Sequence, residues 1–181
     1  MKMLLDACVI YPTVMREMLL GVARTGAYTP LWSARILEEW ALAARKLGPQ
    51  GEGIARGEIA MLGAAWPTAS VPVHAGLEAR LWLPDPGDIH VLAAAVSGNA
   101  EGIITMNAKD FPRGILAEEG LSRNDPDAFL LGLFRADPDA VMPVALAVVQ
   151  EACRLSGEDW NLRSLMKKAR LPRLGKALTA P

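Results

Sequence analysis

The chain lacks the features that mark several large classes of protein. Its 181 residues include only two cysteines, Cys8 and Cys153, so a disulfide framework beyond one bridge is impossible and a reducing compartment is expected. No stretch approaches the ~18 apolar residues of a membrane span, and the longest candidate, 141–149, contains Pro143. Asp6 interrupts the N-terminal apolar run too early for a signal peptide. These patterns predict a soluble cytoplasmic protein.

The sequence also has no overall excess of basic residues. Its 19 Lys and Arg residues oppose 20 Asp and Glu residues, whereas nucleic-acid binders usually carry an excess of Lys and Arg. The near-neutral total conceals a division, because residues 163–181 contain no acidic residue and six basic ones. These are Arg163, Lys167, Lys168, Arg170, Arg173 and Lys176. They form either a solvated tail or a binding surface for RNA or a partner.

Several common catalytic motifs are missing. His74 and His90 lack the spacing of zinc ligands, and no nucleophile elbow occurs. The glycine cluster at 48–57 follows an expected helix rather than a strand, which favours a plain loop over a phosphate-binding loop. Cys8 has no basic neighbour to lower its pKa, so it is expected to be a small core residue.

Hydrophobic runs alternate with helical patterns in the first two thirds of the chain. The expected strands are 3–9, 28–32 and 102–106, and the main expected helices are 13–24, 33–47, 54–65 and 88–97. Alternation of this kind predicts an α/β fold with a parallel sheet.

Only helices are expected from residue 126 onward. They cover 126–135, 138–155 and 160–169, and a tail punctuated by Pro and Gly follows. The 138–155 helix is apolar on two faces, which predicts burial inside the protein or against a partner. We therefore expect a domain at 1–135 and a helical extension with a basic tail at 136–181.

Carboxylates stand at unusual places in this pattern. Asp6 lies in an apolar strand, where an unpaired carboxylate costs several kcal/mol unless it caps a turn or binds a metal. At about 100° per residue, Glu39 falls at the edge of the apolar stripe of its helix, whereas Glu38 falls opposite that stripe. Glu39 is therefore the functional candidate, and Glu38 is expected to be solvated.

Further polar residues follow later in the chain. Asp88 opens a small-residue helix, either as an N-cap or as a ligand, and Asp85 is expected only to form the preceding turn. Thr105, Asn107 and Asp110 follow the Ile103-Ile104 pair of the expected strand, at the end where open α/β sheets place their ligand crevice.

Carboxylates gathered in one crevice raise one another's pKa, and a divalent cation resolves this conflict. Oxygen ligands favour Mg²⁺, with Mn²⁺ as a substitute, and such a site supports attack of a metal-activated water on a phosphodiester.

Four segments together carry a resemblance to a known family. LLDACVI, WSARILEEW, PDPGDIHVLAAAV and IITMNAKDFP, spread over residues 3–112, resemble the PIN-domain nucleases, including the VapC-like toxins of bacterial type II toxin–antitoxin systems. A later PDAFL at 126–130 resembles one bacterial subgroup. The resemblance implies a three-layer α/β/α fold around a central parallel sheet, Mg²⁺-dependent endoribonuclease activity, an RNA substrate, an antitoxin partner and a homodimer.

The resemblance assigns roles to particular residues. It places the catalytic and metal-binding acids on Asp6, Glu39, Asp88 and Asp110, with Thr105 and Asn107 in support. Two positions depart from the common pattern: Cys8 stands where many members have Asn or Ser, and Asn107 is Asp in some relatives. Residues beyond 135 lie outside the resemblance, and for their basic run three roles stay open: a solvated tail, a contact with RNA phosphates, or a docking surface for an acidic antitoxin segment.

Two other functions compete with this interpretation. A non-catalytic or housekeeping PIN protein that binds or processes RNA shares the fold, but binding alone does not need clustered carboxylates. A haloacid-dehalogenase-like phosphatase also places an Asp after its first strand. That class generally has a second Asp two residues later, where this chain has Cys8.

Overall fold

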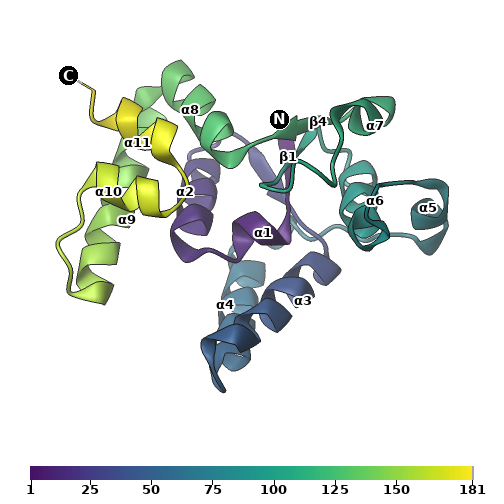
Figure 1. Cartoon of the computed structure of the whole chain (residues 1–181), viewed down its shortest axis with the longest axis horizontal. Coiled ribbons are helices and arrows are strands. Elements are labelled where there is room, and N and C mark those ends of the chain that lie inside the picture. The colour runs from purple at the N-terminus through teal and green to yellow at the C-terminus, as the bar shows by residue number, and fades with distance from the viewer. Residues whose placement is uncertain (181) are drawn as a thin grey trace. The chain divides into compact units, whose positions relative to one another are not determined.

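The computed structural model describes residues 1–180, apart from the side chain of Ala75. The described chain packs as two compact units (Figure 1). Unit 1 contains Met1–Tyr11 and Thr29–Arg123, and unit 2 contains Pro12–Tyr28 and the segment from Asn124 onward. None of the helices in this part of the chain is long and apolar enough to cross a membrane. The predicted division of the chain into a domain at 1–135 and an extension at 136–181 stays a prediction.

Unit 1 is built on a parallel sheet. Its strands run in the order β2-β1-β3-β4 and cover β1 Lys2–Leu5, β2 Thr29–Leu31, β3 Gly102–Ile104 and β4 Ser122–Asn124. The central strand β1 pairs in parallel with both neighbours, so that Leu4 lies opposite Leu31 and Ile103. Leu4 and Ile103 are fully buried, as expected for a parallel sheet with helices on its faces. The predicted α/β/α class is confirmed.

Helices and short helical turns flank this sheet. They are α1 Ala7–Ile10, α3 Ala34–Ala43, η1 Ala44–Leu47, α4 Gly51–Ala65, α5 Ala75–Arg80, η2 Pro86–Asp88, α6 Ile89–Ser97 and α7 Arg113–Glu118. Ser33 caps α3 as predicted, and its Oγ accepts a hydrogen bond from Ile36 N at 3.3 Å. Gly48 ends the η1 turn with φ +111°, a conformation that glycine adopts easily.

Three predicted boundaries in unit 1 were wrong. The strand expected at 102–106 ends at Ile104. The strand expected at 3–9 ends at Leu5, because the chain turns into α1 at Asp6. Helix α4 begins at Gly51 rather than at residue 54, so part of the glycine cluster is helical. The prediction of a loop there was correct only for the residues around Gly48.

Helix α6 packs closely on the sheet and so positions Asp88. Ala93, Ala94 and Ala95 are completely buried, and α6 contacts both β1 and β3. Small side chains let a helix approach a sheet closely. The N-terminus of α6, which carries Asp88, is therefore held against the sheet.

Unit 2 is entirely helical. Its helices are α2 Thr13–Arg24, α8 Pro126–Ala136, α9 Pro138–Ser156, α10 Leu162–Lys168 and α11 Pro172–Leu178. A Cβ placed on Gly21 of α2 would lie 2.5 Å from a methyl group of Val144, so α2 and α9 make a close approach there. Only Val141 and Ala145 of α9 are fully buried, and Leu146 and Leu155 are 53% and 67% exposed. The prediction that both apolar faces of α9 are buried within the chain was therefore wrong. The alternative, that a partner buries one of them, stays a prediction.

The expected C-terminal tail is a helix. Leu171, Leu174 and Leu178 are buried, and α11 packs against α8 and α10. Their spacing of three and four residues is the helical signal that the Pro and Gly residues obscured. The buried carboxylate of Asp127 accepts hydrogen bonds from Arg173 N at 2.9 Å and Leu174 N at 2.8 Å. This acid therefore fastens the first turn of α11 to α8.

Replacing Asp127 with alanine should destabilise unit 2. The Asp127→Ala change leaves two amide groups without their charged acceptor, so the free energy of unfolding should fall by about 2–4 kcal/mol in urea denaturation. Asp139→Asn, at an exposed position in the first turn of α9, should cost less than about 1 kcal/mol. Equal losses in the two variants would contradict the role of Asp127.

Candidate metal centre

Asp6 stands at the C-terminal end of the central strand. Its backbone N donates to Ile104 O at 3.2 Å, which places Asp6 beside the end of β3. The Thr105 hydroxyl donates to Asp6 Oδ2 at 2.7 Å, and only 6% of Asp6 is exposed. Within the described residues no hydrogen bond reaches Oδ1, so this oxygen keeps its lone pairs for a ligand.

Cys8 supports the same carboxylate. Its thiol donates to Asp6 Oδ2 at 3.1 Å, and its Sγ accepts a hydrogen bond from Met106 N at 3.3 Å. Burial, followed by the negative charge of Asp6, raises the pKa of the Cys8 thiol to about 12. The thiol therefore stays protonated at neutral pH, which is unfavourable for a nucleophile, and Cys8 is half-buried rather than part of the core. It occupies a position at which Asn or Ser is common in the resembled family and makes a hydrogen bond there.

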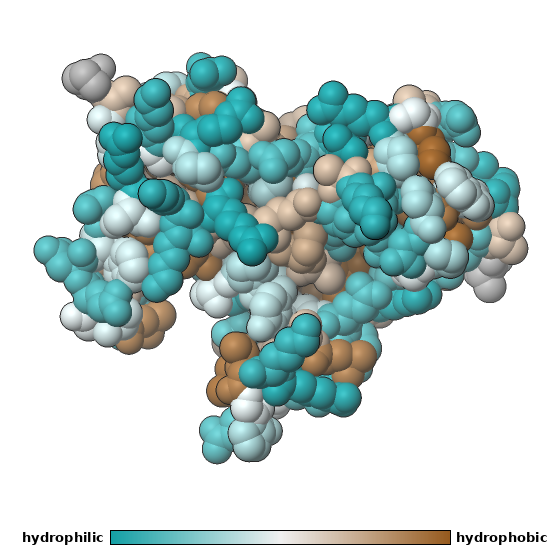
Figure 2. All heavy atoms as spheres, viewed as in Figure 1, coloured by the Kyte–Doolittle hydropathy of each residue, from teal (hydrophilic) through white to brown (hydrophobic). Residues whose placement is uncertain are grey.

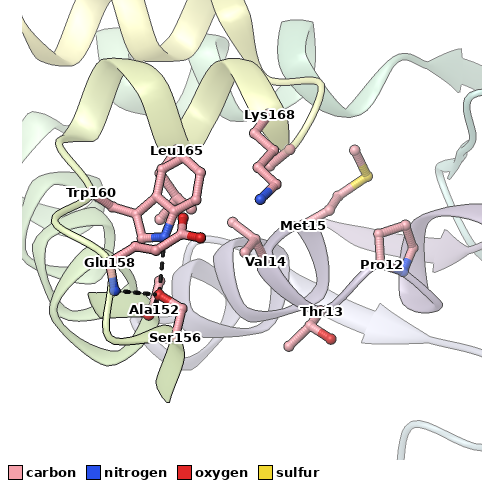
Figure 3. A pocket seen from close by; sticks show the side chains of 11 residues that line it. Pro12, Thr13, Val14, Met15, Ala152, Ser156, Glu158, Trp160, Leu165 and Lys168 are labelled. Atoms are coloured by element: carbon pink, nitrogen blue, oxygen red, sulfur yellow. Dashed lines mark hydrogen bonds between the residues drawn. The ribbon is translucent and has the colours of Figure 1, made fainter. Parts of the chain in front are cut away.

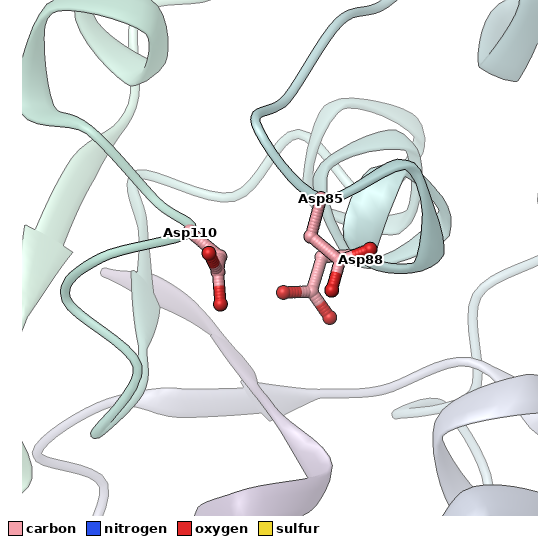
Figure 4. A group of neighbouring side chains, drawn as sticks. All are labelled: Asp85, Asp88 and Asp110. Atoms are coloured by element: carbon pink, nitrogen blue, oxygen red, sulfur yellow. The ribbon is translucent and has the colours of Figure 1, made fainter.

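Asp85 and Asp88 lie at the two ends of a tight turn. In a 3₁₀ turn such as η2, side chains three residues apart are eclipsed. Asp85 Oδ1 accepts from Gly87 N at 2.8 Å, which confirms its predicted role in the turn. Oxygen atoms of Asp85, Asp88 and Asp110 also lie within 4.8 Å of one another (Figure 4). Asp85 was predicted only to form the turn and not to be a ligand. Its spacing of three residues from Asp88 was the feature of the sequence that could have indicated a shared site.

Asn107 connects the two chain segments that carry Asp88 and Asp110. Its Nδ2 donates to Asp88 Oδ2 at 3.1 Å, and its Oδ1 accepts from Asp110 N at 3.4 Å. Its own backbone N donates to Thr105 Oγ1 at 2.9 Å. Thr105 and Asn107 thus form one hydrogen-bonded chain between Asp6 and Asp88, and the fully buried Phe111 anchors the loop behind them.

Glu39 reaches this region from α3. Its Oε1 lies 2.7 Å from His90 Nε2, in an orientation outside hydrogen-bond geometry, and 3.9 Å from Arg35 Nε. His90 is 1% exposed and sits two residues after Asp88, so Glu39 contacts the helix that carries Asp88. Glu38, in contrast, is exposed and pairs with Arg56 at 2.7 Å, as its place on the helix predicts.

The electrostatics at Asp88 link all of these acids. Burial is the main reason that its pKa rises from 3.8 to about 6, and the charges of Asp6, Asp85, Asp110 and Glu39 add to the effect. Asp88 and Asp110, two of the four predicted acids, lie together with Asp85, and the charges of Asp6 and Glu39 act on Asp88 as well. The six basic residues at 163–176 belong to unit 2, whereas this cluster belongs to unit 1.

The donor set suits a hard divalent cation. All the gathered groups are carboxylates, and oxygen ligands are those that Mg²⁺ and Mn²⁺ prefer. A cation between Asp85, Asp88 and Asp110 would offset the repulsion that raises the pKa of Asp88. The residues present therefore fit the metal.

A parallel α/β fold with acids at the C-terminal ends of its strands defines a class of proteins with an acidic ligand crevice. Comparison with protein families identifies the particular family: a model described as PIN domain matches residues 2–109. The chain belongs to the PIN-domain family, whose members are generally metal-dependent nucleases. No curated protein and no solved structure matches the chain significantly.

Because the pKa of Asp88 is raised, we predict that replacing Asp88 with a neutral residue stabilises the fold by an amount that depends on pH. A carboxyl whose pKa is higher in the folded state than in the unfolded state stabilises the fold at low pH, and this contribution is lost as pH rises through about 6. In EDTA at pH 7.5, Asp88→Asn should raise the free energy of unfolding by about 1 kcal/mol, after allowance for solvent screening. The gain should shrink as the pH falls from 7.5 to 4.5. A gain that is independent of pH, or a loss at pH 7.5, would contradict the clustering of charge at Asp88.

Proposed function

We propose that this protein is a Mg²⁺-dependent endoribonuclease that cleaves RNA phosphodiester bonds with metal-activated water. One observation carries the proposal: carboxylate oxygens of Asp85, Asp88 and Asp110, from two separate segments, lie within 4.8 Å of one another, and the charges of Asp6 and Glu39 also act on Asp88. Membership of the PIN-domain family supports the nuclease class. A non-catalytic RNA-binding role would leave this costly arrangement of acids without a purpose.

The proposed ligands are Asp6, Asp88, Asp110 and Glu39, with Asp85 as an additional acid at the same place. When bound, Mg²⁺ lowers the pKa of a coordinated water and neutralises charge that develops on the phosphate. The chain's own part is to hold its oxygens in place. Thr105 Oγ1 donates a hydrogen bond to Asp6 Oδ2, and Asn107 holds the Asp110 segment against Asp88.

The finer proposal is that the protein is the toxin of a cytoplasmic toxin–antitoxin pair. Its support is the resemblance of residues 3–112 to VapC-like toxins. An antitoxin and a second copy of the chain are the proposed protein partners. Unit 1 offers apolar surface for such a contact on η1 and the helices on either side of it, where Leu42, Leu47, Ile54 and Met61 are 39–73% exposed (Figure 2).

The nuclease proposal predicts metal-dependent cleavage of single-stranded RNA. The purified chain should cut RNA with Mg²⁺ or Mn²⁺, and EDTA should abolish the cutting. Asp6→Asn and Asp110→Asn should each lower the rate at least about 100-fold, because each removes a charged ligand. Asp139→Asn, which changes an exposed acid in unit 2, is the matched control and should keep full activity. Cleavage that survives EDTA or Asp6→Asn would refute the proposal.

The toxin proposal makes a separate prediction in cells. Induced expression of the wild-type chain in a bacterial host should arrest growth, whereas Asp6→Asn at the same protein level should not. Co-expression of a small gene adjacent to the natural one should restore growth. An active nuclease that leaves growth unaffected would indicate a housekeeping enzyme instead.

A further inference from the structure

Unit 2 contains a cavity of about 340 Å³ to which no function has been assigned above (Figure 3). This volume lies at the lower end of the ~300–1,000 Å³ typical of small-ligand pockets. Apolar side chains from α2 and α10, including Val14, Met15 and Leu165, form much of its wall. The indole of Trp160 and the ammonium of Lys168 also line it. The cavity thus combines an aromatic ring, an apolar wall and a cation.

The aromatic wall is held in a fixed orientation. Trp160 Nε1 donates to Ser156 Oγ at 3.2 Å, and Trp160 N donates to Cys153 Sγ at 3.2 Å. The Ser156 hydroxyl in turn donates to Ala152 O at 2.7 Å. Lys168 Nζ lies 4.3 Å from the centroid of the Trp160 ring. A planar ligand would therefore meet a preformed aromatic surface with a cation beside it.

The surroundings of the cavity carry unneutralised positive charge. The six basic residues of α10, α11 and their connection are all exposed, and none forms an ion pair within the described residues. Several exposed arginines elsewhere in the chain are paired with acids, as in Arg45–Glu52, Arg56–Glu38 and Arg80–Glu119. The unpaired cations therefore form a local surface suited to a polyanion.

Arg170, one of these cations, has an unusual backbone conformation. It adopts φ +62° directly after α10, and Leu171 N donates to Met166 O at 2.8 Å across it. Glycine is the usual residue at this position of a helix end, because a side chain is strained there. The chain keeps an exposed cation at this strained position.

We infer that the cavity holds one unpaired base of a single-stranded RNA, while Lys168 and its basic neighbours contact the flanking phosphates. This inference rests on the proposed ribonuclease function and assigns its substrate a docking site in unit 2. Bases of single-stranded RNA stack on aromatic side chains, and their phosphates pair with Lys and Arg. Glu158, the acid at the cavity, is suited to accept a hydrogen bond from a base amino group.

An acidic protein segment fits the same surface less well. A docked amphipathic helix presents a row of apolar anchors at intervals of three to four residues and needs an extended groove. This cavity is compact and has a single aromatic wall. One planar ring with an attached anionic backbone matches it more closely.

RNA binding without cleavage provides the test. The full-length Asp6→Asn chain in EDTA is titrated into a fluorescein-labelled 12-nucleotide single-stranded RNA of mixed sequence, and anisotropy is measured at several salt concentrations. Lys168→Gln should weaken binding and reduce the magnitude of the log–log salt slope by about 0.7. Trp160→Ala should weaken binding roughly 5- to 100-fold. Trp82→Ala, which removes a 65% exposed Trp from unit 1, is the matched control and should bind like the parent.

Folding of each variant is checked by circular dichroism, and Trp160→Phe, which keeps an aromatic wall, should bind more tightly than Trp160→Ala. Parent-like binding by both Lys168→Gln and Trp160→Ala would overturn the inference. So would preferential binding of a labelled acidic peptide that RNA fails to displace. The proposed function is assessed separately by cleavage with the wild-type chain and Mg²⁺. RNA binding at the cavity without any cleavage would refute the proposed nuclease function but would still support the docking site.

Discussion

Mutual repulsion of carboxylates is the constraint on which the candidate site depends. Asp88 is partly buried and has four other acids near enough to raise its pKa, so without a cation this edge of the sheet is electrostatically unfavourable. The rest of unit 1 keeps the acids together despite this repulsion. Parallel pairing of β1 with β3 fixes Asp6 beside Thr105, and the packing of α6 on the same strands fixes Asp88.

The hydrogen bonds behind the acids explain how the arrangement is held. Thr105 contacts both Asp6 and Asn107, and Asn107 contacts the segments that carry Asp88 and Asp110. Each bond is modest by itself, but the chain of bonds spans strand, loop and helix. Cys8 contributes a protonated thiol to the same network. These supporting residues connect the end of β3, the loop that follows it and the start of α6.

Much of this arrangement was predictable from local sequence patterns. Apolar runs located β1, β2 and β3, the helical wheel separated Glu39 from Glu38, and Ser33 marked the start of α3. Strand β4 was missed because its sequence, SRN, has no apolar run. Sequence spacing did not predict the features that depend on tertiary contacts. Asp127 fastens a helix 46 residues away in the sequence, so the order of the C-terminal segment was missed. Asp85 was missed because the eclipsing of its side chain with Asp88 depends on a 3₁₀ turn.

The central claim is that the carboxylate cluster of unit 1 is a divalent-metal site, and Mn²⁺ bound to a crystal of the wild-type chain tests it most directly. Anomalous diffraction at the manganese absorption edge locates the ion independently of activity. The predicted result is a peak bounded by Asp88 and Asp110, with Asp6 or Asp85 as a further ligand, and its loss in Asp110→Asn crystals. Mn²⁺ bound only elsewhere, or an undiminished peak in Asp110→Asn, would contradict the claim.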